Sequence, residues 1–406
     1  MKQNKFRKFI NDIHLWLGLG AGIILFVVCL SGTVYTFRSE IEYMVNPDKY
    51  NANPYKPPQQ LETLISDLQK QEKGKVTVIT IPGNISKNYE LGLVKKDTPG
   101  REAPGREKKK EEGAKGISKD RKEERPQRVR PSTYYVDPYS GKVMGKDGDK
   151  TSQFFMVMMR LHRWLLLEDN IGRPIVGTAT LIFVLLSVSG LILWFPRKFR
   201  HWKRWFYWKP GFKIKYKARW KRINHDLHNT LGFYSLFILL IMSLTGLCWS
   251  FEWYKDGVSN IMGSEVFAGR NEKPVQIENP EGTLLPFEEI LRIGAKELPY
   301  EGNIRISLPR DSASALTLYK NKTGFFALSA SDKININPYT GTVVSKDIFK
   351  DKPLNVQIVS LIRALHLGDI FGTFSKIIYF IACLIGTSLP VTGIFIWINK
   401  MRKSKK

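Results

Sequence analysis

The chain has 406 residues and a formal net charge of +26 at pH 7. A charge of this size raises the question of nucleic-acid binding. Much of it flanks long apolar segments, where anionic lipid is the nearer partner, so we expect no nucleic-acid partner. The three cysteines, Cys29, Cys248 and Cys383, fall inside apolar segments, which excludes a disulfide framework and a CxxC site.

Four apolar segments are long enough to cross a lipid bilayer, which takes about 20 residues. They are Ile13–Phe37, Pro174–Phe195, Thr230–Phe251 and Lys376–Ile398. The first is too long for a signal peptide, and Arg38 and Glu40 follow it without a small-residue cleavage site, so we interpret it as a membrane anchor. The sequence therefore predicts a membrane protein with a bundle of four transmembrane helices.

Short basic segments at the ends of these spans predict the orientation. Lys and Arg precede the first span and close the chain, and twelve of them, with no acidic residue, lie in 197–222 between the second and third spans. Because such loops stay in the cytoplasm, we expect both termini to be cytoplasmic and the segments 38–173 and 252–375 to lie outside. Tryptophans interleave with the basic residues of 197–222, as is typical of an interfacial belt.

The first outer segment has the pattern of a small α+β domain. Pro57–Gln71 predicts an amphipathic helix, Val76–Ile81 and Tyr89–Val94 predict strands, and two short strands flank an Asp-Pro-Tyr-Ser-Gly turn within 133–143. The helix should bury one apolar face, made of Leu61, Leu64, Ile65 and Leu68. Between these parts, the insert 95–130 is nearly all Lys, Arg, Glu, Gly and Pro, which predicts a disordered or extended loop.

A helix carrying His162, over Gln153–Asp169, comes next. We expect it to lie at the outer surface of the bilayer, separate from the second span. The second half of the chain repeats this order without the charged insert. It has a helix at Leu285–Leu298, strands at Asn303–Leu308, Ala315–Tyr319 and Phe325–Ser329, an Asn-Pro-Tyr-Thr-Gly turn within 334–344, and a helix carrying Arg363 and His366 before the fourth span.

The two halves align residue by residue. Placing His14 on His228 places Gly18 on Gly232, Ser31-Gly32 on Thr245-Gly246 and Tyr35 on Trp249, and His366 then corresponds to His162. We interpret the chain as a tandem duplication. Its expected division is 1–37 (tail and first span), 38–152 (first outer domain), 153–196 (interfacial helix and second span), 197–229 (basic cytoplasmic loop), 230–251 (third span), 252–352 (second outer domain) and 353–406 (interfacial helix, fourth span and tail).

The repeated turns, the Leu-His-Arg-Trp and Ala-Leu-His segments and the His-Asp-Leu-His entry into the third span resemble the PepSY-associated transmembrane family. This family includes bacterial iron-regulated membrane proteins and ferrisiderophore reductases of the FoxB type. The resemblance implies an inner-membrane protein with two extracytoplasmic PepSY domains and b-type haem held by histidines. His14, His162, His228 and His366 match the recurrent histidines of the family, whereas His225 matches less well.

The residues themselves support the same interpretation. Bis-histidine ligation of haem needs two imidazoles from different helices that approach one iron from opposite sides. Duplicated helices related by a pseudo-twofold axis bring equivalent residues face to face, so we pair His14 with His228 near the inner surface and His162 with His366 near the outer one. This predicts two haems b. A single histidine at a membrane boundary is more often only an interfacial polar group, and the repeated pattern is what favours ligation.

Neighbouring residues have two interpretations each. Arg160, Arg163 and Arg363 are placed to pair with haem propionates, or they anchor to lipid headgroups. Gly18, Gly22 and Gly232 leave room for a flat macrocycle, or Gly18 and Gly22 simply form a GxxxG helix-packing pair. His225 lies on the same helical turn as His228, so it cannot complete the same iron site; it is better suited to a hydrogen bond or a propionate contact.

These observations favour transmembrane electron transfer to an extracytoplasmic acceptor, which by resemblance is a ferric siderophore. The chain carries no flavin or nicotinamide domain, so the electron donor is a membrane quinol, a reduced flavin or a separate cytoplasmic protein. The alternative is a non-redox PepSY protein that binds peptides or modulates a protease, with spans that serve only as anchors. A chelate transporter is a third possibility, which the lack of broken helices and buried acids in the spans disfavours.

Overall fold

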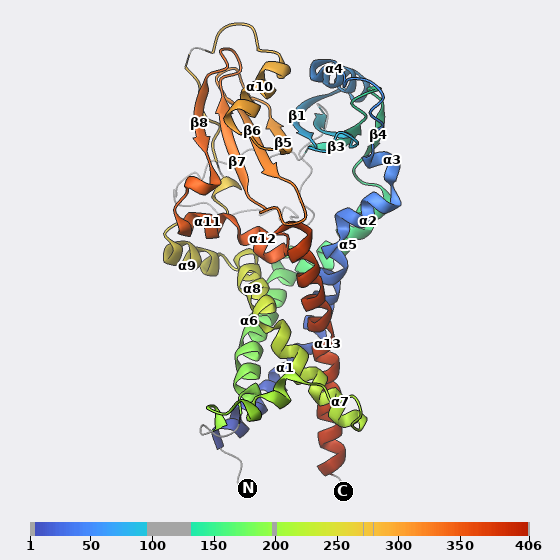
Figure 1. The fold of residues 1–406 in the computed structure, drawn as a ribbon, viewed down its shortest axis with the longest axis vertical. Helices are drawn as coiled ribbons and strands as arrows, with labels where there is room; N and C mark the ends of the chain where they lie inside the picture. Colours follow the sequence, from blue (N-terminus) through green and yellow to red (C-terminus); the bar gives the residue numbers. More distant parts are fainter. Residues whose placement is uncertain (1–4, 96–130, 197–200, 271, 279, 405–406) are drawn as a thin grey trace, which may run out of the picture.

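The computed structural model describes residues 5–95, 131–196, 201–270, 272–278 and 280–404. A helical bundle carries a β-sheet at one end, the sheet end, and both chain termini at the other, the terminal end (Figure 1). Four helices are long and apolar enough to cross a membrane: Lys5–Thr36, Asp169–Trp194, Trp220–Ser250 and Gly372–Arg402. Each covers one predicted span to within one residue, so the prediction of four helices able to cross a membrane is confirmed.

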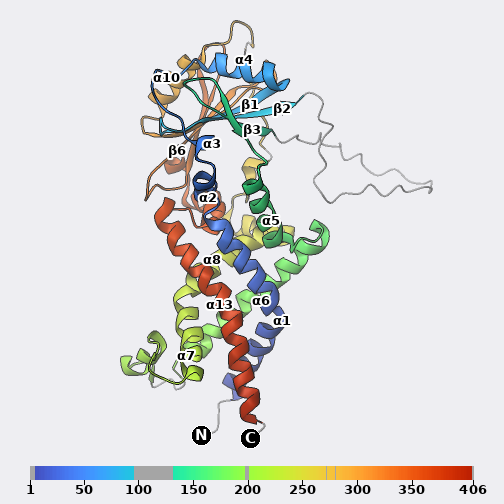
Figure 2. The same cartoon turned by 90° about the vertical axis from the view of Figure 1, so that its right-hand side faces the viewer.

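The bundle consists of α1 (Lys5–Thr36), α6 (Asp169–Trp194), α8 (Gly232–Ser250) and α13 (Gly372–Ser404). Helix α1 packs against α6 and α13, and α8 packs against the same two helices (Figure 2). Toward the terminal end, α8 continues through a π-helical turn at Leu227–Leu231 into α7 (Trp220–Asp226). A π-turn inserts one residue into the helical register, a feature that often marks functional sites.

Short helices surround the bundle at the sheet end. They are α2 (Arg38–Val45), α3 (Pro47–Tyr50), α5 (Lys150–Trp164), α9 (Glu252–Met262), α11 (Leu354–Ser360) and α12 (Ile362–Leu367). Helix α5 packs against α1 and α6, and α12 packs against α8. Leu165 and Leu166 both have positive φ, so the chain turns sharply after α5 and α6 begins as a separate helix. The predicted break before the second span is therefore confirmed.

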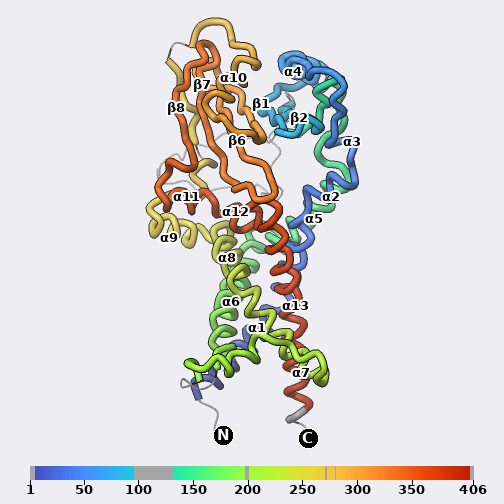
Figure 3. The backbone as a smooth tube through the Cα atoms, in the orientation of Figure 1, coloured from blue at the N-terminus to red at the C-terminus, as the bar shows by residue number. Residues whose placement is uncertain are grey.

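The sheet has eight antiparallel strands in the order β4-β3-β2-β1-β5-β6-β7-β8. The strands are β1 (Gly74–Ile81), β2 (Tyr89–Lys95), β3 (Ser132–Val136), β4 (Val143–Lys146), β5 (Gly302–Ser307), β6 (Leu316–Lys322), β7 (Ser331–Ile336) and β8 (Val343–Asp347). Each half of the chain contributes four consecutive strands, and the halves meet where β1 pairs with β5. The tube in Figure 3 shows the two α+β units side by side above the bundle.

One helix from each half packs against the sheet, on the side away from the bundle, and contributes to the core (Figure 2). Leu61, Leu64, Ile65 and Leu68 of α4 (Leu61–Glu72) are buried against Ile79, Leu91 and Ile306 of the strands, as predicted. Helix α10 (Phe287–Glu297) adds Ile290 to the same cluster. One continuous apolar core therefore joins both units.

One predicted strand is wrong. Phe325–Ser329 forms no strand but a connection from β6 to β7 that runs to the start of α13. The Ser329 N–H donates to the Ile370 carbonyl at 2.8 Å, and the Phe374 N–H donates to the Phe325 carbonyl at 3.1 Å. The backbone groups of Phe325–Ser329 thus form hydrogen bonds with residues at the start of α13 rather than with a neighbouring strand. The interpretation of 96–130 as a disordered insert lies outside the described residues.

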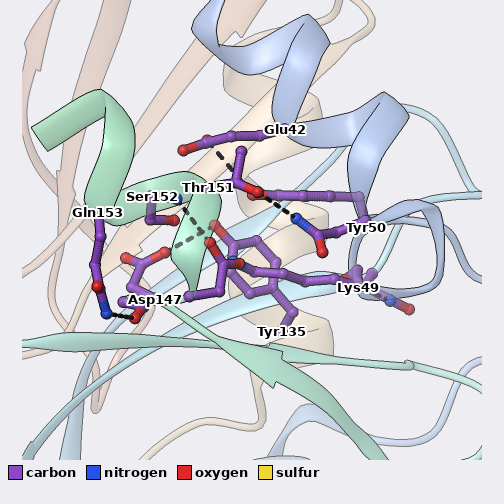
Figure 4. A network of polar contacts seen from close by, with 12 residues as sticks. Glu42, Lys49, Tyr50, Tyr135, Asp147, Thr151, Ser152 and Gln153 are labelled. Atoms are coloured by element: carbon purple, nitrogen blue, oxygen red, sulfur yellow. Dashed lines mark hydrogen bonds and ion pairs between the residues drawn. The ribbon is translucent and has the colours of Figure 1, made fainter. Parts of the chain in front are cut away.

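A polar network joins the first α+β unit to the bundle (Figure 4). The Lys49 ammonium, almost fully buried, contacts the Asp149 carboxylate at 2.7 Å, and Asp149 also accepts a hydrogen bond from the Ser152 N–H as the N-cap of α5. The Tyr135 hydroxyl donates to Asp147 at 3.2 Å. This network sets the position of α5, which carries His162.

Candidate functional site

The structure brings the histidines together in two pairs from different helices. The ring centres of His14 and His228 are 6.3 Å apart with perpendicular planes, toward the terminal end of the bundle. The ring centres of His162 and His366 are 6.2 Å apart, at the sheet end. We call these the terminal-side pair and the sheet-side pair. In each pair, one histidine comes from each half of the chain.

Hydrogen bonds determine the protonation of the sheet-side pair. His162 Nδ1 lies 2.9 Å from the Val28 carbonyl oxygen on α1, and His366 Nδ1 lies 2.8 Å from the Met242 carbonyl oxygen on α8. A carbonyl can only accept, so both Nδ1 atoms carry hydrogen. Burial lowers the pKa of both imidazoles, to about 4 for His366, so both rings are neutral. Each Nε2 therefore keeps its lone pair.

The terminal-side pair has the same arrangement with hydroxyl partners. His14 Nδ1 lies 2.9 Å from the Ser189 hydroxyl on α6, and His228 Nδ1 lies 2.9 Å from the Thr392 hydroxyl on α13. Ser189 donates its single hydroxyl hydrogen to the Leu186 carbonyl, and Thr392 donates its own within α13. With their hydrogens on these carbonyls, both hydroxyls are free to accept from the imidazole Nδ1–H, the tautomer in which Nε2 again keeps a lone pair. Such second contacts typically orient metal-binding histidines.

A glycine lies against each of the four rings. A Cβ on Gly32 would lie 3.0 Å from His162 Cε1, and one on Gly246 would lie 2.9 Å from His366 Cε1. The corresponding distances are 3.3 Å from Gly190 to His14 and 3.5 Å from Gly393 to His228. At the sheet-side pair, any larger residue would force the ring to shift.

A cavity of about 1160 Å³ surrounds the terminal-side pair. Both imidazoles line it, together with Gly18, Gly22 and Gly232, where the sequence predicts room for a flat group. The aromatic wall includes Trp194 stacked on Phe233, with ring centres 3.8 Å apart. The volume is slightly above the roughly 300–1,000 Å³ typical of cofactor sites.

Basic groups line the cavity as well. Arg7 donates to the carbonyls of Leu193 and Phe195 at the end of α6, and Arg222 pairs with the buried Asp226 at 2.8 Å. His225 is exposed, lies beside Asp226 and lines the same cavity as His228. Positive charge at this cavity suits an anionic substituent on a bound group. His225 thus lies at the cavity, whereas His228 is the histidine whose ring faces His14.

The arginines predicted near the sheet-side pair occupy different surroundings. Arg163 lies over the Trp164 ring at 4.8 Å and is close enough to His162 and His366 to act on both electrostatically. Arg160 is half-buried on α5, and Arg363 is exposed on α12 near Asp369. Arg163 is therefore the arginine whose charge acts most directly on the pair.

Sequence reasoning missed the partners Ser189 and Thr392 and the glycines that follow them. A signal exists, because Val188-Ser-Gly-Leu-Ile-Leu-Trp194 is repeated as Val391-Thr-Gly-Ile-Phe-Ile-Trp397. The same small-polar residue followed by glycine occurs at Ser31-Gly32 and Thr245-Gly246. All four long helices thus carry a Ser/Thr-Gly step at a histidine ring.

Within the described part of the chain, no cluster of three or more His, Cys, Asp or Glu residues is arranged to hold a metal ion. A comparison with curated proteins finds no match. A family model described as the PepSY-associated TM region matches residues 12–400, which is nearly the whole chain. With its four apolar helices and two opposed histidine pairs, this multi-pass membrane protein belongs to the PepSY-associated transmembrane family.

Proposed function

We propose that each histidine pair binds a b-type haem and that the protein transfers electrons across the membrane to an extracytoplasmic ferric siderophore. The observation that carries this proposal is the opposition of two imidazoles in each pair, each with its Nδ1 in a hydrogen bond and its Nε2 available. Nothing in an ordinary helix bundle requires this arrangement to occur twice. It is the donor set of a bis-histidine haem.

The distances fit such a group. Two metal–nitrogen bonds of about 2 Å, with about 1.1 Å from each nitrogen to its ring centre, give about 6.2 Å between the imidazoles of one metal. The observed ring-centre distances are 6.3 and 6.2 Å. At the terminal-side pair, the cavity provides space for the porphyrin ring. The basic residues that line it would supply the counter-charge for the haem propionates. When bound, haem supplies one-electron redox chemistry at iron.

The basic segment 201–222 and the basic ends of the chain favour a cytoplasmic position for the terminal end and, in a bacterium, a position outside the inner membrane for the sheet end. Electrons then enter at the terminal-side pair and leave at the sheet-side pair. The two α+β units, with four strands each, are consistent with a tandem duplication and with PepSY-like domains. Reduction to Fe²⁺ lowers the affinity of hard oxygen chelators for iron, so transfer of one electron is enough to release the metal.

The test is the absorption spectrum of the protein purified from haem-replete cells. We expect a reducible bis-histidine b-type spectrum with about two haems per chain. His228→Ala and His366→Ala should each retain about one haem, whereas His201→Ala, outside both pairs, should retain two. A colourless wild-type preparation would contradict haem binding and favour the non-redox PepSY alternative.

The electron donor can be identified by changing charge. Lys203, Arg204 and Lys209 are basic residues between α6 and α7. If an acidic cytoplasmic protein is the donor, neutralising all three should slow haem reduction by that protein and weaken its salt dependence. The matched control neutralises three exposed lysines of the α+β units, Lys75, Lys142 and Lys350. Unchanged kinetics in the first variant would favour a quinol or a reduced flavin.

A further inference from the structure

The connection between β6 and β7 exposes two adjacent phenylalanines. Phe325 is 50% and Phe326 66% accessible to solvent. The centres of their two rings are 4.8 Å apart. The ring centre of Phe374 on α13 lies 6.3 Å from that of Phe325 and 5.1 Å from that of Phe326. Exposed aromatic side chains in a contiguous group usually mark a contact surface.

This connection is held in place by backbone contacts. Besides the hydrogen bonds from Ser329 and Phe374, Leu328 forms an isolated β-bridge with Phe371. Gly372 has φ +58°, and a Cβ there would lie 2.6 Å from the Gly324 carbonyl oxygen. The connection from β6 to β7 reaches the start of α13 (Figure 1). The exposed rings therefore sit on a loop that is bonded to the beginning of this helix.

The exposed surface continues along α13. Phe371 and Phe374 are exposed, and so are Ile377, Ile378 and Ile381, which follow at helical spacing on the same side of α13. All of these residues except Phe371 lie in the membrane-spanning segment that starts at Gly372. Another side of the same helix is polar or buried, since Lys376 pairs with Glu40 at 2.7 Å and Tyr379 is buried. The phenylalanines thus extend the lipid-facing surface of α13 onto the sheet unit.

We propose that Phe325 and Phe326 insert into the interfacial region of the lipid bilayer and anchor the second α+β unit to the membrane surface. Aromatic and apolar side chains at the headgroup level gain by burying their rings at the acyl boundary. Because the loop is bonded to α13, this contact fixes the distance between the sheet and the membrane. The proposal rests on the fold alone and does not depend on haem binding.

The test uses the full chain in lipid nanodiscs with a nitroxide label on Phe326→Cys. The native cysteines lie in the membrane-spanning helices, and unmodified protein treated with the same reagent gives the background. Collisions with lipid-soluble O₂ are compared with collisions with a water-soluble nickel chelate. The matched control is Leu284→Cys, a similarly exposed apolar residue, at 60%, just before α10.

The label at Phe326→Cys should collide several-fold more with O₂ than with the chelate, and the label at Leu284→Cys should show the opposite preference. Phe325→Cys provides a second, independent variant with the same expected result. Chelate accessibility at Phe326→Cys equal to that at Leu284→Cys would overturn the proposal. Protection from both reagents would also overturn it, because that result indicates a protein contact rather than lipid.

Discussion

The ring of His162 rests directly against Gly32, whose missing side chain is the reason that the histidine reaches the bundle. A Cβ at this glycine would lie 3.0 Å from Cε1 and 3.1 Å from Nδ1 of the imidazole. The same ring donates from Nδ1 to the Val28 carbonyl, one helical turn earlier on α1. The glycine and the carbonyl together fix both the position and the tautomer of the histidine.

Replacing Gly32 by Val should therefore displace His162. If the sheet-side pair binds haem, the Gly32→Val protein should retain about one haem per chain, because the other pair is untouched. Gly20→Val is the matched control on the same helix, since a Cβ at Gly20 meets nothing within 4 Å. The measurement is haem per chain by absorption. Full occupancy in Gly32→Val would show that the contact does not restrict the ring.

Ser189→Ala and Thr392→Ala should weaken haem retention at the terminal-side pair without abolishing it. Loss of a second contact to a ligand histidine typically costs about 10–100-fold in metal affinity. Transfer of haem to an apoprotein acceptor should accelerate by a comparable factor, and the midpoint potential of one haem should shift. Ser243→Ala serves as the control, because the Ser243 hydroxyl bonds the Leu239 carbonyl within α8. Equal transfer rates in all variants would contradict a positioning role.

The ion pair between Lys49 and Asp149 should make the first α+β unit sensitive to acid. Burial acts to raise the pKa of Asp149, but its hydrogen bonds with Lys49 and Ser152 are stronger and hold that pKa below its usual value of 3.8. A carboxylate with a lowered folded-state pKa stabilises the fold above its unfolded-state pKa. This contribution is lost as the pH falls below about 4, through the folded-state pKa.

Asp149→Asn keeps the helix cap but removes the charge, so it should cost about 1–2 kcal/mol of stability at pH 7. The difference from the wild type should shrink as the pH is lowered through about 4 and vanish below the folded-state pKa. The measurement is denaturant unfolding of the sheet at several pH values. Asp67→Asn, on an exposed position of α4, should show little difference at any pH. A constant difference for Asp149→Asn would argue against the ion pair as its cause.

Ile306→Ala should destabilise both α+β units together. Ile306 is fully buried and lies opposite Ile79 where β5 pairs with β1. Loss of such a side chain costs about 2–5 kcal/mol. Hydrogen exchange should therefore become faster in β2 and in β6, which lie on opposite sides of that contact. Arg305→Ala changes the neighbouring residue on the other face and should have a small effect. Faster exchange in β6 alone would mean that the units unfold separately.

Local pattern was sufficient to predict much of this structure. The four spans follow from length and hydropathy, and the buried face of α4 follows from helical spacing. The pairing of His14 with His228 follows from the repeat, because equivalent positions of the two halves face each other across the bundle. In each case the information lies in short stretches of sequence or in their duplication.

Other features depend on contacts that leave no local trace. The β1–β5 pairing joins residues more than 200 positions apart, so the sequence indicates two α+β domains but not one continuous sheet. Phe325–Ser329 is rich in apolar residues, as a strand would be, but its backbone bonds the approach to α13. In the sequence Ser189 looks like any serine in a helix, because its role depends on the contact with His14 that only the fold creates.

The junction of β1 and β5 has a consequence for how the polypeptide can be divided. Each of these strands covers an edge of the other, so a fragment ending in the 201–219 region would leave an unpaired strand beside an open apolar core. Such an edge recruits other chains and promotes aggregation. If the two fragments were produced in the same cell, each would carry the strand that pairs with the exposed strand of the other. Each half of this protein thus supplies the strand that the other half needs to complete its sheet and cover its core.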